Sequence, residues 1–216
     1  MKQQLEKFEV DGVRLEADVI TTPGATGAVL FVHGSGSSRH SSRNQYVARV
    51  LQQRALDTVL MDLLTSDEER AERFTGHLRF DIELLARRVV GVVDQLRDES
   101  KLPFGLFGAS TGAAAALVTA AARPDDIVTV VSRGGRPDLA GAALPSVVAP
   151  TLLIVGGADR EVLELNRQAR HAMTRAREVR MEIVSGASHL FEEPGALEQA
   201  ATLASDWFTL HLKGEA

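Results

Sequence analysis

The chain has 216 residues, a formal net charge of −5 and no cysteine. Disulfide frameworks, thiolate nucleophiles and cysteine-ligated zinc are therefore excluded, and interspersed acidic and basic residues offer no basic stripe for nucleic acid. The length suits a single domain over residues 1–216. Because no apolar run approaches the roughly 18 residues of a membrane span, we expect a soluble, cytoplasmic protein without a membrane partner.

The first predicted element is an antiparallel hairpin. Val13, Leu15, Ala17 and Val19 alternate with polar residues, and the pair Asp11-Gly12 precedes them. Such period-two alternation after a turn dipeptide is typical of strands with one solvated face.

The strands after the hairpin have a different character. They are short and continuously apolar, as expected for strands buried on both faces of a parallel sheet. They occupy residues 28–33, 58–64, 104–109, 127–132 and 151–157. A last strand, over 179–184, alternates again.

Helical patterns lie between these strands. Apolar residues recur at spacings of three and four over 82–96 and again over 197–208, and a further helix is predicted after Asp159. The polar connection 65–76 is expected to be a surface loop or a short helix. The whole is an α/β protein with a mostly parallel sheet and helices on both faces, in which sites lie beyond the carboxyl ends of the strands.

Ser110 is the first candidate for chemistry. It stands in Gly108-Ala109-Ser110-Thr111-Gly112, which matches G-x-S-x-G between a buried strand and a helix. Flanking glycines allow a sharp turn that raises the hydroxyl above the sheet. The alternative is a tight packing turn in a chain rich in alanine and glycine.

A serine nucleophile needs a base and an acid that orients the base. His189 follows the last predicted strand and Asp159 follows the strand 151–157, so both fall at the same edge as Ser110. Individually, the histidine could be a surface residue and the aspartate a helix N-cap. Together, in the order Ser, Asp, His, they predict a catalytic triad, with Asp138 as a second candidate for the acid.

An oxyanion hole requires two donors aimed at the developing negative charge. We expect one from the N–H of Thr111, which follows the nucleophile, and the other from Ser35 in the glycine-rich loop after the strand 28–33.

The motifs HGSG, GASTG, GGAD and GASHLFEEPG together resemble the α/β-hydrolase superfamily, specifically its small dienelactone-hydrolase-like branch. The resemblance runs from Gly27 to the C-terminal helix and implies that fold, with Ser110, His189 and Asp159 as triad and Ser35 and Thr111 as oxyanion donors. It implies no cofactor and no metal. That branch uses a cysteine nucleophile, so Ser110 is a departure that favours small carboxylic esters as substrates.

The resemblance also bears on access to the site. Many superfamily members carry a helical cap after the sixth strand, whereas here only residues 133–150 separate two strands. We therefore expect no cap domain and an open, shallow site.

Arginines at the same edge of the sheet could give the site a preference for negatively charged substrates. Arg39 and Arg133, with His40 and Arg43 near them, fall in loops there, and two arginines could bind a substrate carboxylate. The alternative is that they form structural ion pairs or face water.

Two other functions compete with the esterase. A catalytically silent hydrolase fold could serve as a scaffold or binding module. A dinucleotide-binding loop is suggested by Gly34 and Gly36 after a strand and by Asp62 after the next, but Arg39 stands where a third glycine is needed.

Overall fold

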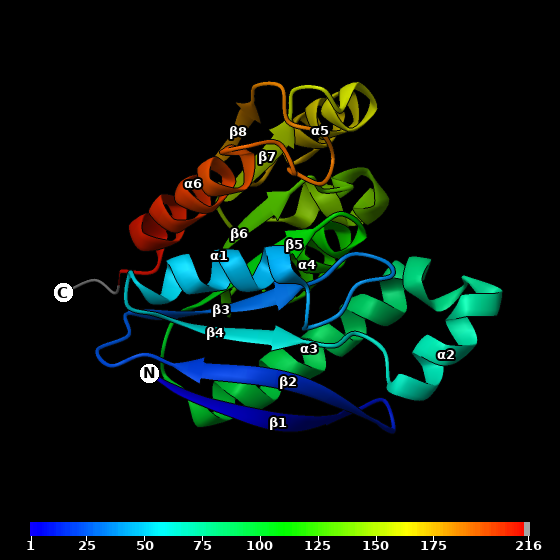
Figure 1. Cartoon of the computed structure of the whole chain (residues 1–216), viewed down its shortest axis with the longest axis vertical. Coiled ribbons are helices and arrows are strands. Elements are labelled where there is room, and N and C mark those ends of the chain that lie inside the picture. The colour runs from blue at the N-terminus through cyan, green and yellow to red at the C-terminus, as the bar shows by residue number, and fades with distance from the viewer. Residues whose placement is uncertain (214–216) are drawn as a thin grey trace.

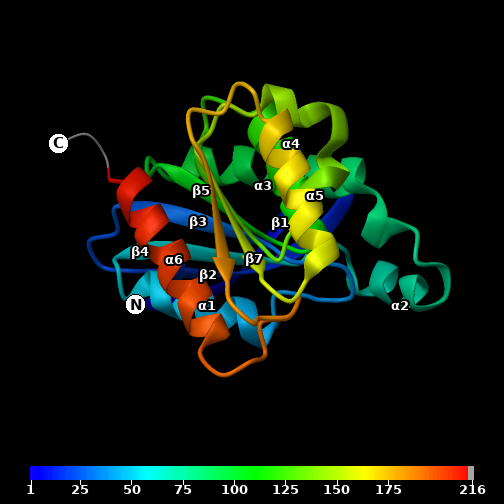
Figure 2. The same cartoon turned by 90° about the horizontal axis from the view of Figure 1, so that it is seen from above.

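The computed structural model describes residues 1–213, apart from the side chain at position 73. Its centre is one eight-stranded sheet in the order β1-β2-β4-β3-β5-β6-β7-β8 (Figures 1 and 2). The strands are β1 (Lys2–Val10), β2 (Val13–Thr21), β3 (Gly27–Val32), β4 (Leu56–Met61), β5 (Phe104–Ala109), β6 (Ile127–Arg133), β7 (Thr151–Gly156) and β8 (Val179–Val184). This confirms the predicted mostly parallel sheet.

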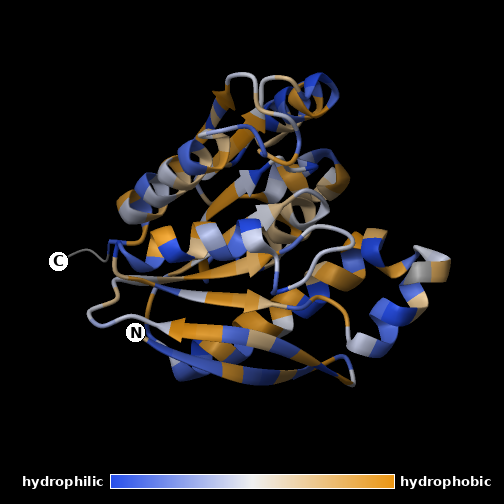
Figure 3. Ribbon diagram, viewed as in Figure 1, coloured by the Kyte–Doolittle hydropathy of each residue, from blue (hydrophilic) through white to orange (hydrophobic). Residues whose placement is uncertain are grey.

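The N-terminal hairpin is the antiparallel part of the sheet. β1 and β2 pair around Asp11 and Gly12, both with positive φ, and β2 pairs antiparallel with β4. All other neighbours are parallel. Every residue of β3, β5 and β7 is buried, which explains their continuous apolar character, visible in the central strands of Figure 3.

Helices cover both faces of the sheet. One face carries α1 (Ser42–Gln52) and α6 (Ala196–His211), whose apolar side chains pack with Phe31, Phe107 and Ile154. The other carries α3 (Ile82–Glu99), α4 (Thr111–Ala122) and α5 (Arg160–Ala172). Figure 2 shows the two layers on opposite sides of the sheet. No helix in residues 1–213 is long and apolar enough to cross a bilayer.

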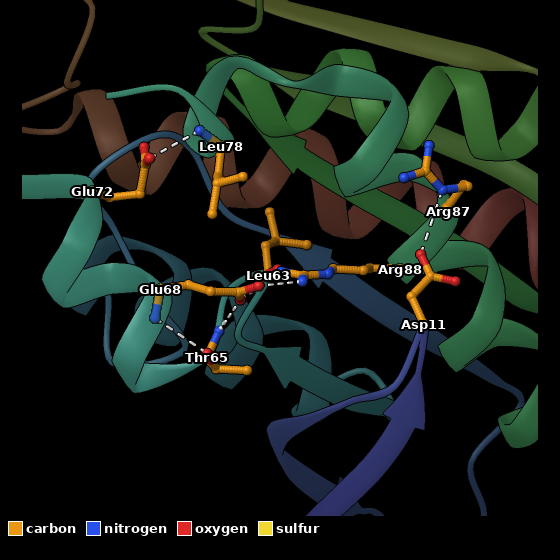
Figure 4. Close-up of polar contacts among 8 residues, drawn as sticks. All are labelled: Asp11, Leu63, Thr65, Glu68, Glu72, Leu78, Arg87 and Arg88. Atoms are coloured by element: carbon orange, nitrogen blue, oxygen red, sulfur yellow. Dashed lines mark hydrogen bonds and ion pairs between the residues drawn. The ribbon is translucent and has the colours of Figure 1, made fainter. Parts of the chain in front are cut away.

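The polar connection 65–76 forms helix α2 (Ser66–Thr75), followed by the short 3-10 helix η1 (Leu78–Phe80). The Thr65 hydroxyl accepts from the Glu68 N–H and the Glu68 carboxylate accepts from the Thr65 N–H, a capping box that begins α2. Glu68 also pairs with the buried Arg88 of α3, which donates to the Leu63 carbonyl as well (Figure 4). These contacts bind α2 to the body of the protein.

One of the expected strands ends earlier than predicted. β4 ends at Met61, whereas a strand was expected to continue to residue 64. The reason is that Leu63 leaves the ladder and its N–H donates to the His33 ring. Between β6 and β7, the segment η2 (Pro137–Ser146) packs against α4 and α5, in agreement with the expected lack of a cap.

Candidate active site

Ser110 lies on a sharp turn between β5 and α4. Its backbone has φ 51° and ψ −125°, a conformation that non-glycine residues rarely adopt. The flanking glycines have no space for a side chain. A Cβ on Gly108 would lie 2.4 Å from Ala113 Cα, and one on Gly112 would lie 2.2 Å from the Val32 carbonyl oxygen. The sequence GASTG therefore folds into the tight turn that the motif predicts.

The structure brings Ser110, His189 and Asp159 together. His189 Nε2 lies 3.2 Å from Ser110 Oγ, and His189 Nδ1 lies 2.7 Å from Asp159 Oδ2. With the proton on Nδ1 donated to the carboxylate, Nε2 is free to accept the serine proton. The three side chains can therefore act as nucleophile, base and orienting acid.

Asp138 is not placed for that role. Its carboxylate accepts two hydrogen bonds from the Arg136 guanidinium, at 2.8 and 2.9 Å. Asp159 is the carboxylate that contacts His189. Although Asp159 stands at the N-cap position of α5, its side chain makes no capping hydrogen bond, so the N-cap alternative does not account for it.

The two residues expected to form the oxyanion hole are in direct contact. The Ser35 N–H donates to Thr111 Oγ1 at 2.9 Å. Ser35 follows Gly34, which packs against the nucleophile so closely that a Cβ there would lie 2.9 Å from Ser110 Cβ. The structure thus places both residues beside Ser110, but directs the N–H of Ser35 to a side chain.

A cavity of about 260 Å³ opens beside Ser110 and His189. Arg133, Arg43 and Asn44 also line it. Asn44 is 2% exposed, and its Oδ1 atom has no hydrogen-bond partner among the described residues. Asn44 was not predicted as a site residue. It lies in no catalytic motif, and nothing in the sequence distinguishes it from the other polar residues of its helix.

Arg133 is a buried cation at the wall of this cavity. It ends β6, is 6% exposed, and its Nε atom has no hydrogen-bond partner in the described part of the chain. Its guanidinium lies over the Phe191 ring, 5.5 Å from the centroid. Burial, and then repulsion from Arg43, lower the pKa of Arg133 to about 10, so it stays charged at neutral pH.

Arg39, one of the two arginines that could bind a substrate carboxylate, does not line the cavity. Its guanidinium pairs with Asp62, with Glu16 at 2.8 Å and with Asp18 at 3.7 Å. Its backbone N–H donates to Asp62 as well, at 2.7 Å. Arg39 therefore anchors the β3–α1 loop to the sheet, the structural alternative for this residue. Asp62, the candidate ribose ligand of the dinucleotide hypothesis, is occupied by the same pairing.

No protein-family model matches the chain. A crystal structure of a dienelactone hydrolase from Anabaena variabilis is 54% identical, with a TM-score of 0.93, and the match covers 98% of both chains. Est1E from Butyrivibrio proteoclasticus has a TM-score of 0.80 at 13% identity, covering 97% of this chain and 99% of that one, and shows the fold alone.

Proteins of two Mycobacterium tuberculosis strains are 57% identical over 191 residues. Both are named provisionally as phosphoribosyl transferases. The match covers 87% of this chain but only 42% of those proteins, so the chain spans less than half of their length.

Proposed function

Because this chain belongs to the dienelactone hydrolase family of the α/β-hydrolases, we propose that it is a serine hydrolase of small carboxylic esters. The observation that carries the proposal is the hydrogen-bonded series Ser110–His189–Asp159 at the edge of the sheet, with distances of 3.2 and 2.7 Å. The cavity beside it, about 260 Å³, suits a small ester.

In the proposed reaction, His189 Nε2 takes the proton of Ser110 Oγ as that oxygen attacks the ester carbonyl carbon. His189 then donates the proton to the departing alcohol, which leaves an acyl group on Ser110. A water molecule, deprotonated by His189, attacks the acyl carbon; as the bond to Ser110 Oγ breaks and the acid leaves, His189 returns the proton to that oxygen. Asp159 holds the imidazole in the required tautomer and stabilises its charged form.

We further propose that the substrate carries an anionic group that binds Arg133. This guanidinium lines the cavity, stays charged and has no acidic partner in the described chain. A buried charge is costly unless it is paired, so a substrate carboxylate would complete the site. Arg133, rather than Arg39, is therefore the candidate substrate-binding arginine.

The phosphoribosyl transferase name is not the best guide to this chain. It applies to whole proteins of which only 42% is matched, whereas the dienelactone hydrolase structure is matched over 98% of its chain. The Ser110–His189–Asp159 geometry gives hydrolysis a direct chemical basis.

Labelling with a fluorophosphonate probe tests the proposal and distinguishes it from a silent scaffold. The purified protein is treated with the probe, and the adduct is located by mass spectrometry. We expect an adduct on Ser110 that is lost in Ser110→Ala and retained in Ser37→Ala, a matched control because Ser37 lines the same cavity. A folded protein that forms no adduct would favour the scaffold.

A further inference from the structure

We propose that the protein forms a two-fold symmetric dimer, in which the edge strand β8 of one protomer pairs antiparallel with β8 of a second copy. β8 is the last strand of the sheet and pairs on one side only, with β7. A free strand edge presents unpaired N–H and C=O groups to any strand that can complete it. In Figure 2, β8 runs between α6 and α5 at the border of the sheet. The inference is independent of the proposed serine hydrolase function.

Contacts with β7 determine which residues of β8 direct their backbone groups outward. The Thr151 N–H donates to the Glu178 carbonyl at 2.9 Å, and the Gly157 N–H donates to the Val184 carbonyl at 2.8 Å. Successive residues of a strand direct their backbone groups to opposite sides, so the even-numbered residues here face β7. Three odd-numbered residues of β8 therefore face outward: Val179, Met181 and Ile183. Within residues 1–213, no hydrogen bond outside the ladder reaches their N–H and C=O groups.

The outward-facing residues match those of a second copy about a two-fold axis at Met181. In an antiparallel ladder, residues that exchange both hydrogen bonds lie directly opposite each other. With the axis at Met181, Val179 lies opposite the partner's Ile183, and Met181 lies opposite the partner's Met181. Each of the three then exchanges both of its hydrogen bonds. Their side chains are apolar, and that of Ile183, 46% exposed in the protomer, would pack against an apolar residue of the second copy.

Charged side chains on the other face of β8 select this register. Arg180 and Glu182 flank Met181, so each arginine lies opposite the glutamate of the other copy. Opposite charges at facing positions stabilise a sheet, and like charges destabilise it. Moving the axis to Arg180 would place the two arginines opposite each other, and moving it to Glu182 would do the same to the two glutamates. Both alternative registers are therefore disfavoured.

Glu182 is the member of this pair that lacks a charged partner within the protomer. No ion pair reaches its carboxylate in residues 1–213, whereas Arg180 pairs with Glu178 at 2.9 Å. The Arg180 guanidinium also lies over the Trp207 ring of α6, 5.2 Å from the centroid, which holds it on the face of the sheet that Glu182 shares. Because exposed ion pairs contribute little binding free energy, these charges act mainly on register. The affinity comes from the backbone bonds and the apolar pairs.

Sedimentation velocity of the purified protein tests the proposal. One strand from each copy makes a small interface, so we expect a weak dimer with a Kd of about 1–100 µM. The measurement therefore covers protein concentrations of about 1–500 µM. A protein that stays monomeric over this whole range overturns the proposal.

Substitutions at Met181 test whether the dimer uses this edge. Met181→Pro removes the outward N–H of each copy but no bond to β7, and an edge strand tolerates proline at such a position. We expect its Kd to rise at least about 10-fold, because two hydrogen bonds across the axis are lost. Met181→Leu is the matched control, since it keeps the N–H and an apolar side chain, and its Kd should stay within about threefold of the wild type. An unchanged Kd in Met181→Pro would show that the dimer uses another surface and would overturn the proposal.

Charge reversal provides a second test that does not depend on proline. Arg180→Glu and Glu182→Arg each place like charges opposite each other on both sides of the axis, and each should raise the Kd by about 3–10-fold. When the two variants are mixed, opposite charges face each other again at both positions. The mixture should therefore form heterodimers more readily than either variant forms homodimers. A mixture that associates no better than its components contradicts the antiparallel pairing of β8.

Discussion

Asp159 accepts a hydrogen bond from His189 at 2.7 Å while occupying the N-cap position of α5, where its carboxylate caps no helical N–H. The side chain is thus committed to the imidazole. We expect Asp159→Asn to lower kcat by about 10³–10⁴-fold, because an amide favours the wrong histidine tautomer. Ester hydrolysis by the two purified variants, Asp159→Asn and Asp138→Asn, measures this. Asp138→Asn is the matched control and should cost little, and a larger loss in that variant would show that the acid is misassigned.

Arg133 should decide between anionic and neutral esters. In Arg133→Met, we expect kcat/KM for a monoester of a dicarboxylic acid to fall about 10–100-fold, the loss of one charge-assisted hydrogen bond. A neutral ester of the same length serves as the internal control and should change less than about threefold. Equal losses on both substrates would show that Arg133 supports the structure of the cavity and does not recognise charge.

The same substitution should stabilise the folded protein. Burial lowers the pKa of Arg133 to about 10, which means that the folded state disfavours its charge. At neutral pH the charge is nevertheless present, and it has no acidic partner in the described chain. We therefore expect Arg133→Met to raise Tm by about 2–8 °C. Differential scanning calorimetry at pH 7 tests this, and a lowered Tm would indicate that the contact with Phe191 outweighs the cost of burying the charge.

Glu72 should contribute stability that is lost in acid. Burial acts to raise the pKa of this carboxyl, but hydrogen bonds from the N–H groups of Leu78 and Arg79 and from the side chains of Thr75 and Arg79 outweigh it and lower the pKa to about 2 (Figure 4 shows the Leu78 contact). Because the folded pKa lies below the ordinary 4.5, the contribution is complete above pH 4.5 and disappears as the pH falls towards 2.

Thermal unfolding of wild type and Glu72→Gln between pH 7 and pH 2.5 tests this contribution. The difference in Tm should be largest at pH 7 and shrink below pH 4.5. A difference that is constant with pH would mean that the ionisation of Glu72 does not matter.

Much of the fold could be predicted because local patterns determine it. Alternation identified β2, and continuous apolar runs identified β3, β5, β6 and β7. The grouping of Ser110, Asp159 and His189 followed from a topological rule, since each comes after a strand of a parallel sheet. Their distances came only from the structure.

The residues that sequence reasoning misplaced or missed depend on long-range contacts. The partners of Arg39 lie on β2 and just after β4, and their proximity comes from the antiparallel pairing of those strands. No local pattern shows that pairing. Asn44 lies in an amphipathic helix whose sequence does not reveal which polar side chain is turned into the cavity.

The crowding around Gly112 has a consequence for mutational scanning. A Cβ there would lie 2.2 and 2.3 Å from the carbonyl oxygens of Val32 and His33. The close packing of Gly112 against the end of β3 therefore fixes both the position of α4 and the orientation of Ser110. Every substitution at this glycine should therefore lower abundance and turnover together. A screen for residues that abolish turnover while sparing expression will identify His189 and will pass over Gly112, although both serve the same serine.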